Sequence, residues 1–172
     1  RIILKSQEDW DKFTSLIIEF IKKIKDINKK DILIRIIGEP YCIKAVDFLI
    51  NLFKKTDNEM LRWSIGNSLS LIKIPEEKLR KIVELVENKD YGAGRQMLLE
   101  ALIKTKNIDY IDVIYRALND PQLTAHAISS LGKISQKESV EKIRPFLKHK
   151  NKLLIKEAEK AINKIEKNIR KQ

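Results

Sequence analysis

The residue types that most often carry out catalysis or hold metals are sparse in this sequence. Cys42 is the single cysteine, and His126 and His149 are the two histidines. Structural zinc sites use four Cys or His ligands, so a site of that kind is not expected. No nucleophile–base motif and no paired acid motif is recognisable. We therefore expect a protein that is not an enzyme and that needs no metal and no cofactor.

The stretch "DYGAGRQ" places Gly92 and Gly94 on either side of an alanine. A glycine-rich phosphate cradle needs a strand before it and a suitably placed lysine after it. Neither is present, so we interpret the stretch as a turn that opens a helix. The N-terminus of that helix could still bind an anion weakly.

The composition favours a helical protein with an aliphatic core. Hydrophobic residues make up 43% of the 172 residues, aromatic residues only 6%, and there are five glycines and four prolines. So little turn material argues against a β-sandwich. No apolar run approaches the roughly 20 residues of a membrane span, and no signal peptide is visible. Together with the lone cysteine, this predicts a cytoplasmic protein that does not enter a membrane.

Positive charge is concentrated towards the C-terminus. Residues 133–172 hold 13 Lys or Arg against 5 Asp or Glu, whereas residues 31–132 hold 14 of each. One interpretation is a patch that binds nucleic acid or an acidic protein; the other is a solvated end of the chain. The candidate patch consists of Lys142, Arg144, Lys148, Lys150, Lys152, Lys156 and Lys160.

An internal repeat of about 31 residues organises the chain. An apolar residue within a similar short pattern recurs with spacings of 33, 33, 29 and 31, at Ile36, Leu69, Leu102, Leu131 and Ile162. A small residue precedes this position in four of the five units. Each unit is long enough for two helices and two turns.

The hydrophobic spacing and the turn residues predict the helices of each unit. First helices are expected over 43–55, 76–88, 108–118 and 137–148, and second helices over 59–73, 93–105, 122–133 and 151–168. Further helices are expected over 7–27 and 31–37, and Pro145 should kink the last first-type helix. Because no unit buries its apolar side alone, we expect an all-α protein that stacks about five helix pairs into an α-solenoid with a concave groove.

Two stretches, "IGEPYCIKAVDFLINLFKKTDNEMLRWSIGNSL" (37–69) and "LNDPQLTAHAISSLGKISQKESVEKIRPFL" (118–147), resemble HEAT repeats of the short, PBS-lyase-like type, as found in small bacterial proteins. The resemblance implies a right-handed superhelix over residues 31–168, with a capping helix region in 1–30 and a basic tail in 169–172. The family pattern has an aspartate in the turn and then an arginine. Asp57 and Arg62 match it, as do Asp90 and Arg95. We interpret these as structural pairs across the repeats, because the planar fork of arginine suits a carboxylate.

The same pattern fades towards the C-terminus. Asp120 matches the turn position, but Thr124 stands where the arginine belongs. In the last unit Lys150 and Ile155 break both positions, as a terminal cap would.

The helix expected over 59–73 carries unusual polar residues. If Leu61, Ile65, Leu69 and Ile72 face the core, then Trp63, Asn67 and Ser70 face away from it. The repeat then places Gln96 beside Trp63 and Glu100 beside Asn67, with His126 near the rim. Gly66 costs roughly 1 kcal/mol in a helix relative to alanine, which suggests close approach by a neighbouring helix or by a ligand. Trp63 either lines the groove or packs under a neighbouring repeat.

These patterns predict a module that binds another protein, since the family implies scaffolding more often than catalysis. The expected contact residues are Trp63, Asn67, Gln96, Glu100 and His126. An adaptor, a regulator and a toxin-neutralising partner all fit, and the chain itself is expected to be monomeric. The alternative is nucleic-acid binding through the basic C-terminal patch, although no aromatic row interleaves with its lysines in the sequence.

Overall fold

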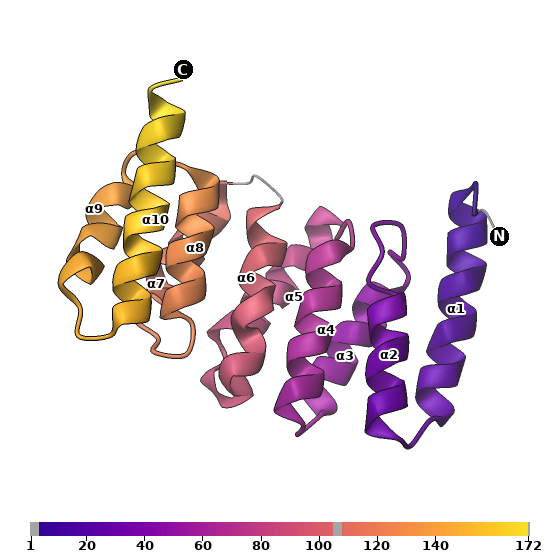
Figure 1. Cartoon of the computed structure of the whole chain (residues 1–172). Helices are drawn as coiled ribbons and strands as arrows, with labels where there is room; N and C mark the ends of the chain where they lie inside the picture. The colour runs from indigo at the N-terminus through magenta and orange to yellow at the C-terminus, as the bar shows by residue number, and fades with distance from the viewer. Residues whose placement is uncertain (1–3, 105–107, 172) are drawn as a thin grey trace. The chain divides into compact units, whose positions relative to one another are not determined.

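The computed structural model describes residues 4–104 and 108–171, and their fold is all-α (Figure 1). The described residues form ten α-helices and three 3-10 helices, and they contain no strand. In chain order these are α1 (Gln7–Lys23), α2 (Ile27–Ile36), α3 (Ala45–Lys55), α4 (Glu59–Leu71), α5 (Glu76–Glu87), η1 (Lys89–Arg95), α6 (Gln96–Ile103), η2 (Ile108–Tyr110), α7 (Ile111–Ala117), α8 (Thr124–Ile134), α9 (Ser139–Ile143), η3 (Arg144–Lys148) and α10 (Lys152–Ile169).

Most predicted helices are confirmed within a few residues, and the differences have local causes. The expected helix over 7–27 ends earlier, because Ile24 is extended and Asp26 caps a new helix by accepting a hydrogen bond from the Lys29 amide. The second helix expected from residue 93 begins as the 3-10 turn η1. Pro145 has the predicted effect, since α9 ends at Ile143 and a 3-10 helix follows.

An Asp or Asn side chain stands just before each second helix, before the 3-10 turn that leads into α6, or, for α8, in the turn that precedes the helix. Its oxygen accepts a hydrogen bond from a backbone amide two or three residues later, which satisfies one of the unpaired donors of a helix N-terminus. These residues are Asp26, Asn58, Asn88, Asp120 and Asn151, at spacings of 32, 30, 32 and 31. The period predicted from apolar residues thus recurs in the caps.

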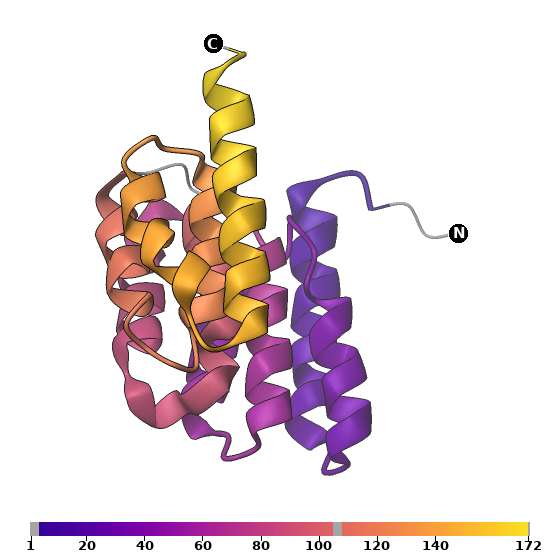
Figure 2. The same cartoon turned by 60° about the vertical axis from the view of Figure 1, so that its left-hand side comes forward.

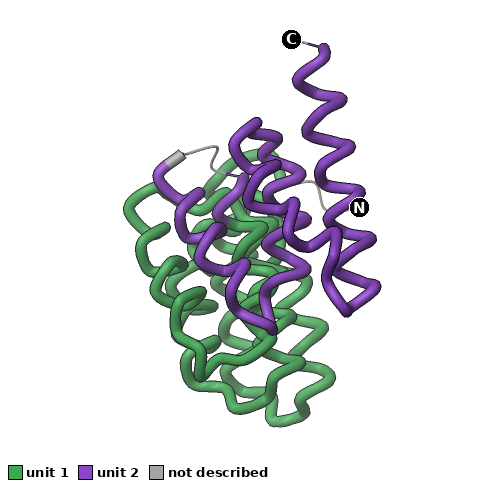
Figure 3. The backbone as a smooth tube through the Cα atoms, turned by 90° about the vertical axis from the view of Figure 1, so that its left-hand side faces the viewer, with its two compact units in different colours: residues 1–101 green, residues 102–172 purple. Residues whose placement is uncertain are grey.

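The chain forms two compact units, residues 1–101 and 102–172 (Figure 3). In unit 1 the helices α2 and α4 and the segment that leads into α6 lie side by side, and α3 and α5 lie behind them (Figure 1). Helix α1 packs against α2 and α3 and closes one end of this unit. The core is aliphatic, with residues such as Leu49, Ile65 and Leu98 fully buried.

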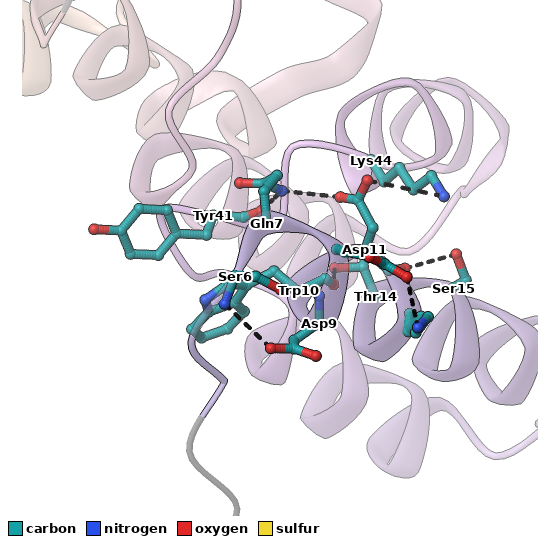
Figure 4. A network of polar contacts seen from close by, with 11 residues as sticks. Ser6, Gln7, Asp9, Trp10, Asp11, Thr14, Ser15, Tyr41 and Lys44 are labelled. Carbon is teal, nitrogen blue, oxygen red and sulfur yellow. Dashed lines mark hydrogen bonds and ion pairs between the residues drawn. The ribbon is translucent and has the colours of Figure 1, made fainter.

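Helix α1 is fastened to the turn before α3 by a polar network (Figure 4). Gln7 Nε2 donates to the Tyr41 carbonyl and to Asp11 Oδ1, both at 2.9 Å. The rings of Trp10 and Tyr41 pack with centroids 5.6 Å apart. Ser6 and Asp9 form a capping box that begins the helix. The position of α1 therefore rests on specific contacts as well as on burial.

In unit 2, α8 packs along α10, with α7 and α9 against α8. Gly132 on α8 allows this close packing, because a Cβ at that position would lie 2.8 Å from the Ala161 Cβ. The last turns of α10 extend beyond the ends of α8 and α9 (Figure 2). Across its sequence this unit carries 16 Lys or Arg against 8 Asp or Glu, whereas unit 1 carries 19 against 16.

Candidate interaction surface

The polar residues of α4 mostly serve packing, which corrects one sequence prediction. Ser64, Ser68 and Ser70 are buried, although Ser70 was expected to face solvent. Ser68 Oγ donates to the Ile34 carbonyl on α2 at 2.9 Å. On the other side of α4, a Cβ on Gly66 would lie 3.3 Å from the Gly94 carbonyl oxygen. Small residues therefore let α4 fit between two neighbouring segments, and for Gly66 the close neighbour is protein.

The repeated arginines are structural, but they bind backbone carbonyls. Arg95 is 1% exposed; its Nη1 donates to the Val86 carbonyl in the last turn of α5 at 2.9 Å, and its Nε donates to the Gly92 carbonyl. Arg62 is also buried, and its Nε donates to the Phe53 carbonyl in the last turn of α3. Both arginines thus cap the preceding helix at the negative end of its dipole.

The expected pairing of these arginines with Asp57 and Asp90 is therefore wrong. Both aspartates are exposed, whereas the guanidinium groups lie among carbonyls. Arg62 also lies 5.1 Å from the centre of the Tyr91 ring, a cation–π contact that shields it further. Spacing in the sequence could not distinguish a carboxylate acceptor from a carbonyl acceptor on the same turn.

Thr124 performs the same task in unit 2. Its Oγ1 donates to the Leu118 carbonyl at 3.1 Å and to the Asp120 carbonyl at 2.7 Å. The Leu118 carbonyl lies six residues before Thr124, just as the Thr56 carbonyl that Arg62 Nη2 also binds lies six residues before Arg62. Thr124 thus meets the same capping requirement as the arginines with a shorter side chain.

The glycine turn before α6 already has an acidic partner. The Ala93 amide donates to Glu59 Oε1 of α4 at 3.0 Å, and Gly92 has a φ of 57°. That positive φ is readily adopted by glycine. The interpretation as a turn that opens a helix is confirmed, and the Ala93 amide is used inside the protein.

One side of unit 1 repeats the same pair of positions on three helices. On each helix one residue of the pair lies two positions before a fully buried residue and the other lies two positions after it. This spacing places the pair on the side of the helix roughly opposite the core. The buried residues are Ile34, Ile65 and Leu98. The flanking residues are Ile32 and Ile36 on α2, Trp63 and Asn67 on α4, and Gln96 and Glu100 on α6. We call these six residues the α2–α4–α6 face.

Two members of this face were missed or misplaced from the sequence. Ile36, predicted as the buried anchor of the first unit, is 41% exposed, and Ile37 next to it is buried instead. Ile32 is 57% exposed. The error arose because α2 is mostly aliphatic, so its pattern does not distinguish the two sides. Trp63, Asn67, Gln96 and Glu100 are all half-buried. Their predicted role as a joint contact surface stays a prediction.

Exposed apolar side chains gather in unit 1. Among the described residues nine large hydrophobic side chains are exposed, and eight belong to this unit: Leu16, Phe20, Ile27, Ile32, Ile36, Tyr41, Met60 and Leu71. Met60 is 83% exposed and lies one turn before Trp63, and Leu71 lies one turn after Asn67. The α4 part of the face is therefore flanked by apolar groups at both ends.

A polar cluster borders the face between α2 and α4. Arg35 Nε contacts Asp31 Oδ2 at 2.7 Å, and Arg35 Nη2 donates to Ser64 Oγ at 2.7 Å. Burial raises the pKa of the Asp31 carboxyl, but hydrogen bonds from Arg35 and Ser64 outweigh it and hold that pKa below its usual value. The cluster fixes the relative rotation of the two helices and so orients their outer residues.

His126 is half-buried on α8 in unit 2, and the structure describes that unit by itself. The predicted role of His126 alongside the unit 1 residues stays a prediction.

The predicted basic patch is divided among several environments. Lys142 Nζ lies 5.8 Å from the centre of the Tyr115 ring, whereas Arg144 contacts Glu141 at 2.9 Å. Hydrogen bonding to Glu141 raises the pKa of Arg144. The other lysines are exposed at the end of η3, in the turn that follows it and along α10. They are Lys148, Lys150, Lys152, Lys156 and Lys160. The patch is thus no single cluster of side chains.

Across the described residues, no three His, Cys, Asp or Glu side chains are grouped so as to hold a metal ion. Within the same residues, no helix is both long enough and apolar enough to span a bilayer. No protein-family model matches the chain, and no curated protein matches it.

Proposed function

We propose that this chain is a non-catalytic interaction module that binds another protein through the α2–α4–α6 face. The observation that carries the proposal is the set of exposed aliphatic side chains on and beside that face, Ile32, Ile36, Met60 and Leu71, together with the half-buried Trp63. Monomeric proteins rarely leave large contiguous apolar surface in water, and such surface commonly marks a protein contact. The helix pairs would stack as a HEAT-like α-solenoid, with this face on its concave side.

The composition of the face supports a protein partner. Its residues change from apolar on α2, through Trp63 and Asn67 on α4, to polar on α6. Apolar anchors bordered by polar groups are the usual anatomy of a protein interface. Because residues 31–132 carry no net charge, the contact would depend on apolar burial, and its affinity would change little with salt.

Capture from a lysate of the source cells tests this proposal with matched surface variants. The baits are the wild type, Ile32→Ser with Ile36→Ser, Trp63→Ala, and the control Leu153→Ser. Leu153 is 55% exposed on α10 and outside the face, so its loss of apolar surface matches that of Ile32. We expect one protein to be retained by the wild type and by the control and lost from both face variants. Removal of Trp63 should cost about 2 kcal/mol or more of binding free energy if it is a central anchor.

Retention by all four baits would refute the role of the face. Circular dichroism of each bait shows whether a loss reflects unfolding, in which case Trp63 belongs to the core. Sedimentation of the purified wild type and of the isoleucine variant identifies the remaining outcome, in which the partner is a second copy of this chain.

A further inference from the structure

Unit 2 contains a cleft that combines aromatic rings with cations. It lies between α7 and η3, has a volume of about 440 Å³, and is lined by Tyr115, Arg116, Asn119, Lys142 and Phe146, with Leu118 and Pro145 completing its wall. This volume falls within the range of about 300–1,000 Å³ that is common for sites that bind small ligands or single chemical groups. The cleft belongs to neither the α2–α4–α6 face nor unit 1.

The two rings of the cleft are held in place by contacts outside it. The Tyr115 hydroxyl is 3.1 Å from Ser139 Oγ of α9, and Ser139 is buried. The Phe146 ring packs against the His149 ring with centroids 6.2 Å apart, and His149 Nδ1 accepts a hydrogen bond from the Asn151 amide. Fixed rings lose little conformational entropy when a flat group stacks on them.

The charge of the cleft distinguishes it from its neighbour. Arg116 and Lys142 line it, and its described lining residues include no carboxylate. The larger cleft between α9 and α10 is lined by three glutamates along with its cations, and the Arg144–Glu141 contact lies there. The positive charge of the first cleft would attract an anion. In the second cleft the glutamates largely offset the positive charge. The exposed residues Lys148 and Lys150 follow Phe146 and add to the positive potential.

We propose that this cleft binds one unstacked base, together with its phosphate, of a single-stranded nucleic acid. A base presents a flat π-surface to Tyr115 or Phe146, and the adjacent phosphate carries the charge that Lys142 attracts. Duplex DNA keeps its bases stacked inside, so it would meet only the cations. An acidic peptide would satisfy the cations but leave the rings without a flat partner.

Fluorescence anisotropy of the full chain with a labelled oligothymidylate of about ten nucleotides tests the proposal. The variants are Phe146→Ala, Phe146→Leu, Lys142→Gln, Tyr115→Phe and the control Lys156→Gln, which removes an exposed charge on α10. Loss of the stacking ring should weaken binding about tenfold. Phe146→Leu keeps the apolar bulk and should also weaken binding, which separates stacking from packing. Tyr115→Phe keeps the ring and should bind like the wild type.

Salt dependence isolates the phosphate contact. For single strands the slope of log affinity against log salt changes by about 0.7 for each phosphate contact. Lys142→Gln should reduce the slope by about that amount, and Lys156→Gln should change it less. Thymidine monophosphate should compete weakly with the labelled oligonucleotide, because a single nucleotide carries both the base and the phosphate that the cleft is proposed to bind.

Three results would overturn the proposal. The first is no binding of the oligonucleotide by the wild type near 100 mM salt. The second is equal binding of the duplex and of the single strand, with no effect of either Phe146 variant. The third is equal competition by polyglutamate, which would show that the cleft responds to charge alone.

Discussion

The two units solve the same structural problem with different side chains. In unit 1, Arg62 and Arg95 reach back from a second helix and bind the last carbonyls of the preceding helix. In unit 2, the Thr124 hydroxyl proton is shared between two carbonyls just beyond the end of α7, those of Leu118 and Asp120. Arginine and threonine are thus two ways to supply a donor at this position, and the last unit, with Ile155, does without one.

The units also differ in what they expose. Unit 1 leaves eight of the nine exposed large hydrophobic side chains of the described residues in water, and unit 2 leaves one. Unit 2 instead carries 16 basic residues against 8 acidic ones. Unit 1 thus exposes more large apolar side chains, and unit 2 carries a larger excess of positive charge.

The largest expected effect comes from the buried arginine. Arg95→Met should lower the free energy of unfolding by about 2–4 kcal/mol, because the carbonyls of Val86 in α5 and of Gly92 lose their charged donor, at about 1–3 kcal/mol each. Thr124→Val should cost only about 1–2 kcal/mol, since it removes neutral hydrogen bonds. Urea unfolding followed by circular dichroism measures both. Equal decreases in the unfolding free energy of the two variants would mean that the positive charge of the arginine adds nothing to the capping hydrogen bonds.

The next contrast is between two glycines at helix contacts. Gly132→Ala places a Cβ 2.8 Å from the Ala161 Cβ, and overpacking of this kind costs about 1–3 kcal/mol. Gly66→Ala meets its nearest atom at 3.3 Å, and the gain of about 1 kcal/mol in helix propensity should nearly offset the crowding.

Thermal unfolding of the two glycine variants provides the comparison. The double variant Gly132→Ala with Ala161→Gly should recover part of the loss, since it restores the space. Failure of the second substitution to help would show that the contact with Ala161 does not limit the packing.

Two buried serines at matched positions of the repeat should respond in opposite directions. Ser68→Ala should destabilise the protein by about 1 kcal/mol, because it leaves the Ile34 carbonyl without its side-chain donor. Ser130 Oγ is buried without a hydrogen-bond partner in the described part of the chain, so Ser130→Ala should be neutral or stabilising by up to about 1 kcal/mol. Denaturant midpoints check the signs, and destabilisation by both substitutions would contradict the contrast.

The smallest expected change in unfolding free energy comes from removing the Asp47 carboxylate, and it should depend on pH. Asp47 of α3 binds Lys78 and Lys81 of α5 at 2.7 and 2.9 Å, and these hydrogen bonds lower the pKa of Asp47 from 3.8. The stability that this cluster contributes is present above pH 3.8 and is lost as the pH falls through the lowered pKa. Because the carboxylate is about half exposed, Asp47→Asn should cost less than about 1 kcal/mol at neutral pH.

Urea unfolding of the wild type and of Asp47→Asn from pH 7 to pH 3 measures that difference, which should shrink at the acid end. A difference that does not change with pH would show that the ionisation of Asp47 is not involved.

Much of the fold could be predicted from the sequence, because helix patterns and caps are local. The helices over residues 45–55, 59–71, 76–87 and 152–169 closely match their predicted ranges. The candidate site was predicted less well. Trp63 and Asn67 lie on α4, Gln96 and Glu100 lie on α6, and all four are half-buried, but Ile32 and Ile36 were missed as surface residues. Sequence spacing shows which residues share one side of a helix. Which of those sides is buried depends on the neighbouring helices.

The amino-acid sequence by itself determined that the chain is helical, that its units repeat about every 31 residues, and that its charge is concentrated at one end. Those properties follow from local periodicity, capping residues and composition. Only the tertiary structure decided that Arg62 and Arg95 bind carbonyls, that the serines of α4 serve packing, and that Tyr115, Lys142 and Phe146 share a cleft. The physical reason is that hydrogen-bond acceptors, burial and clefts arise from segments that are distant in the sequence and meet when the helices pack.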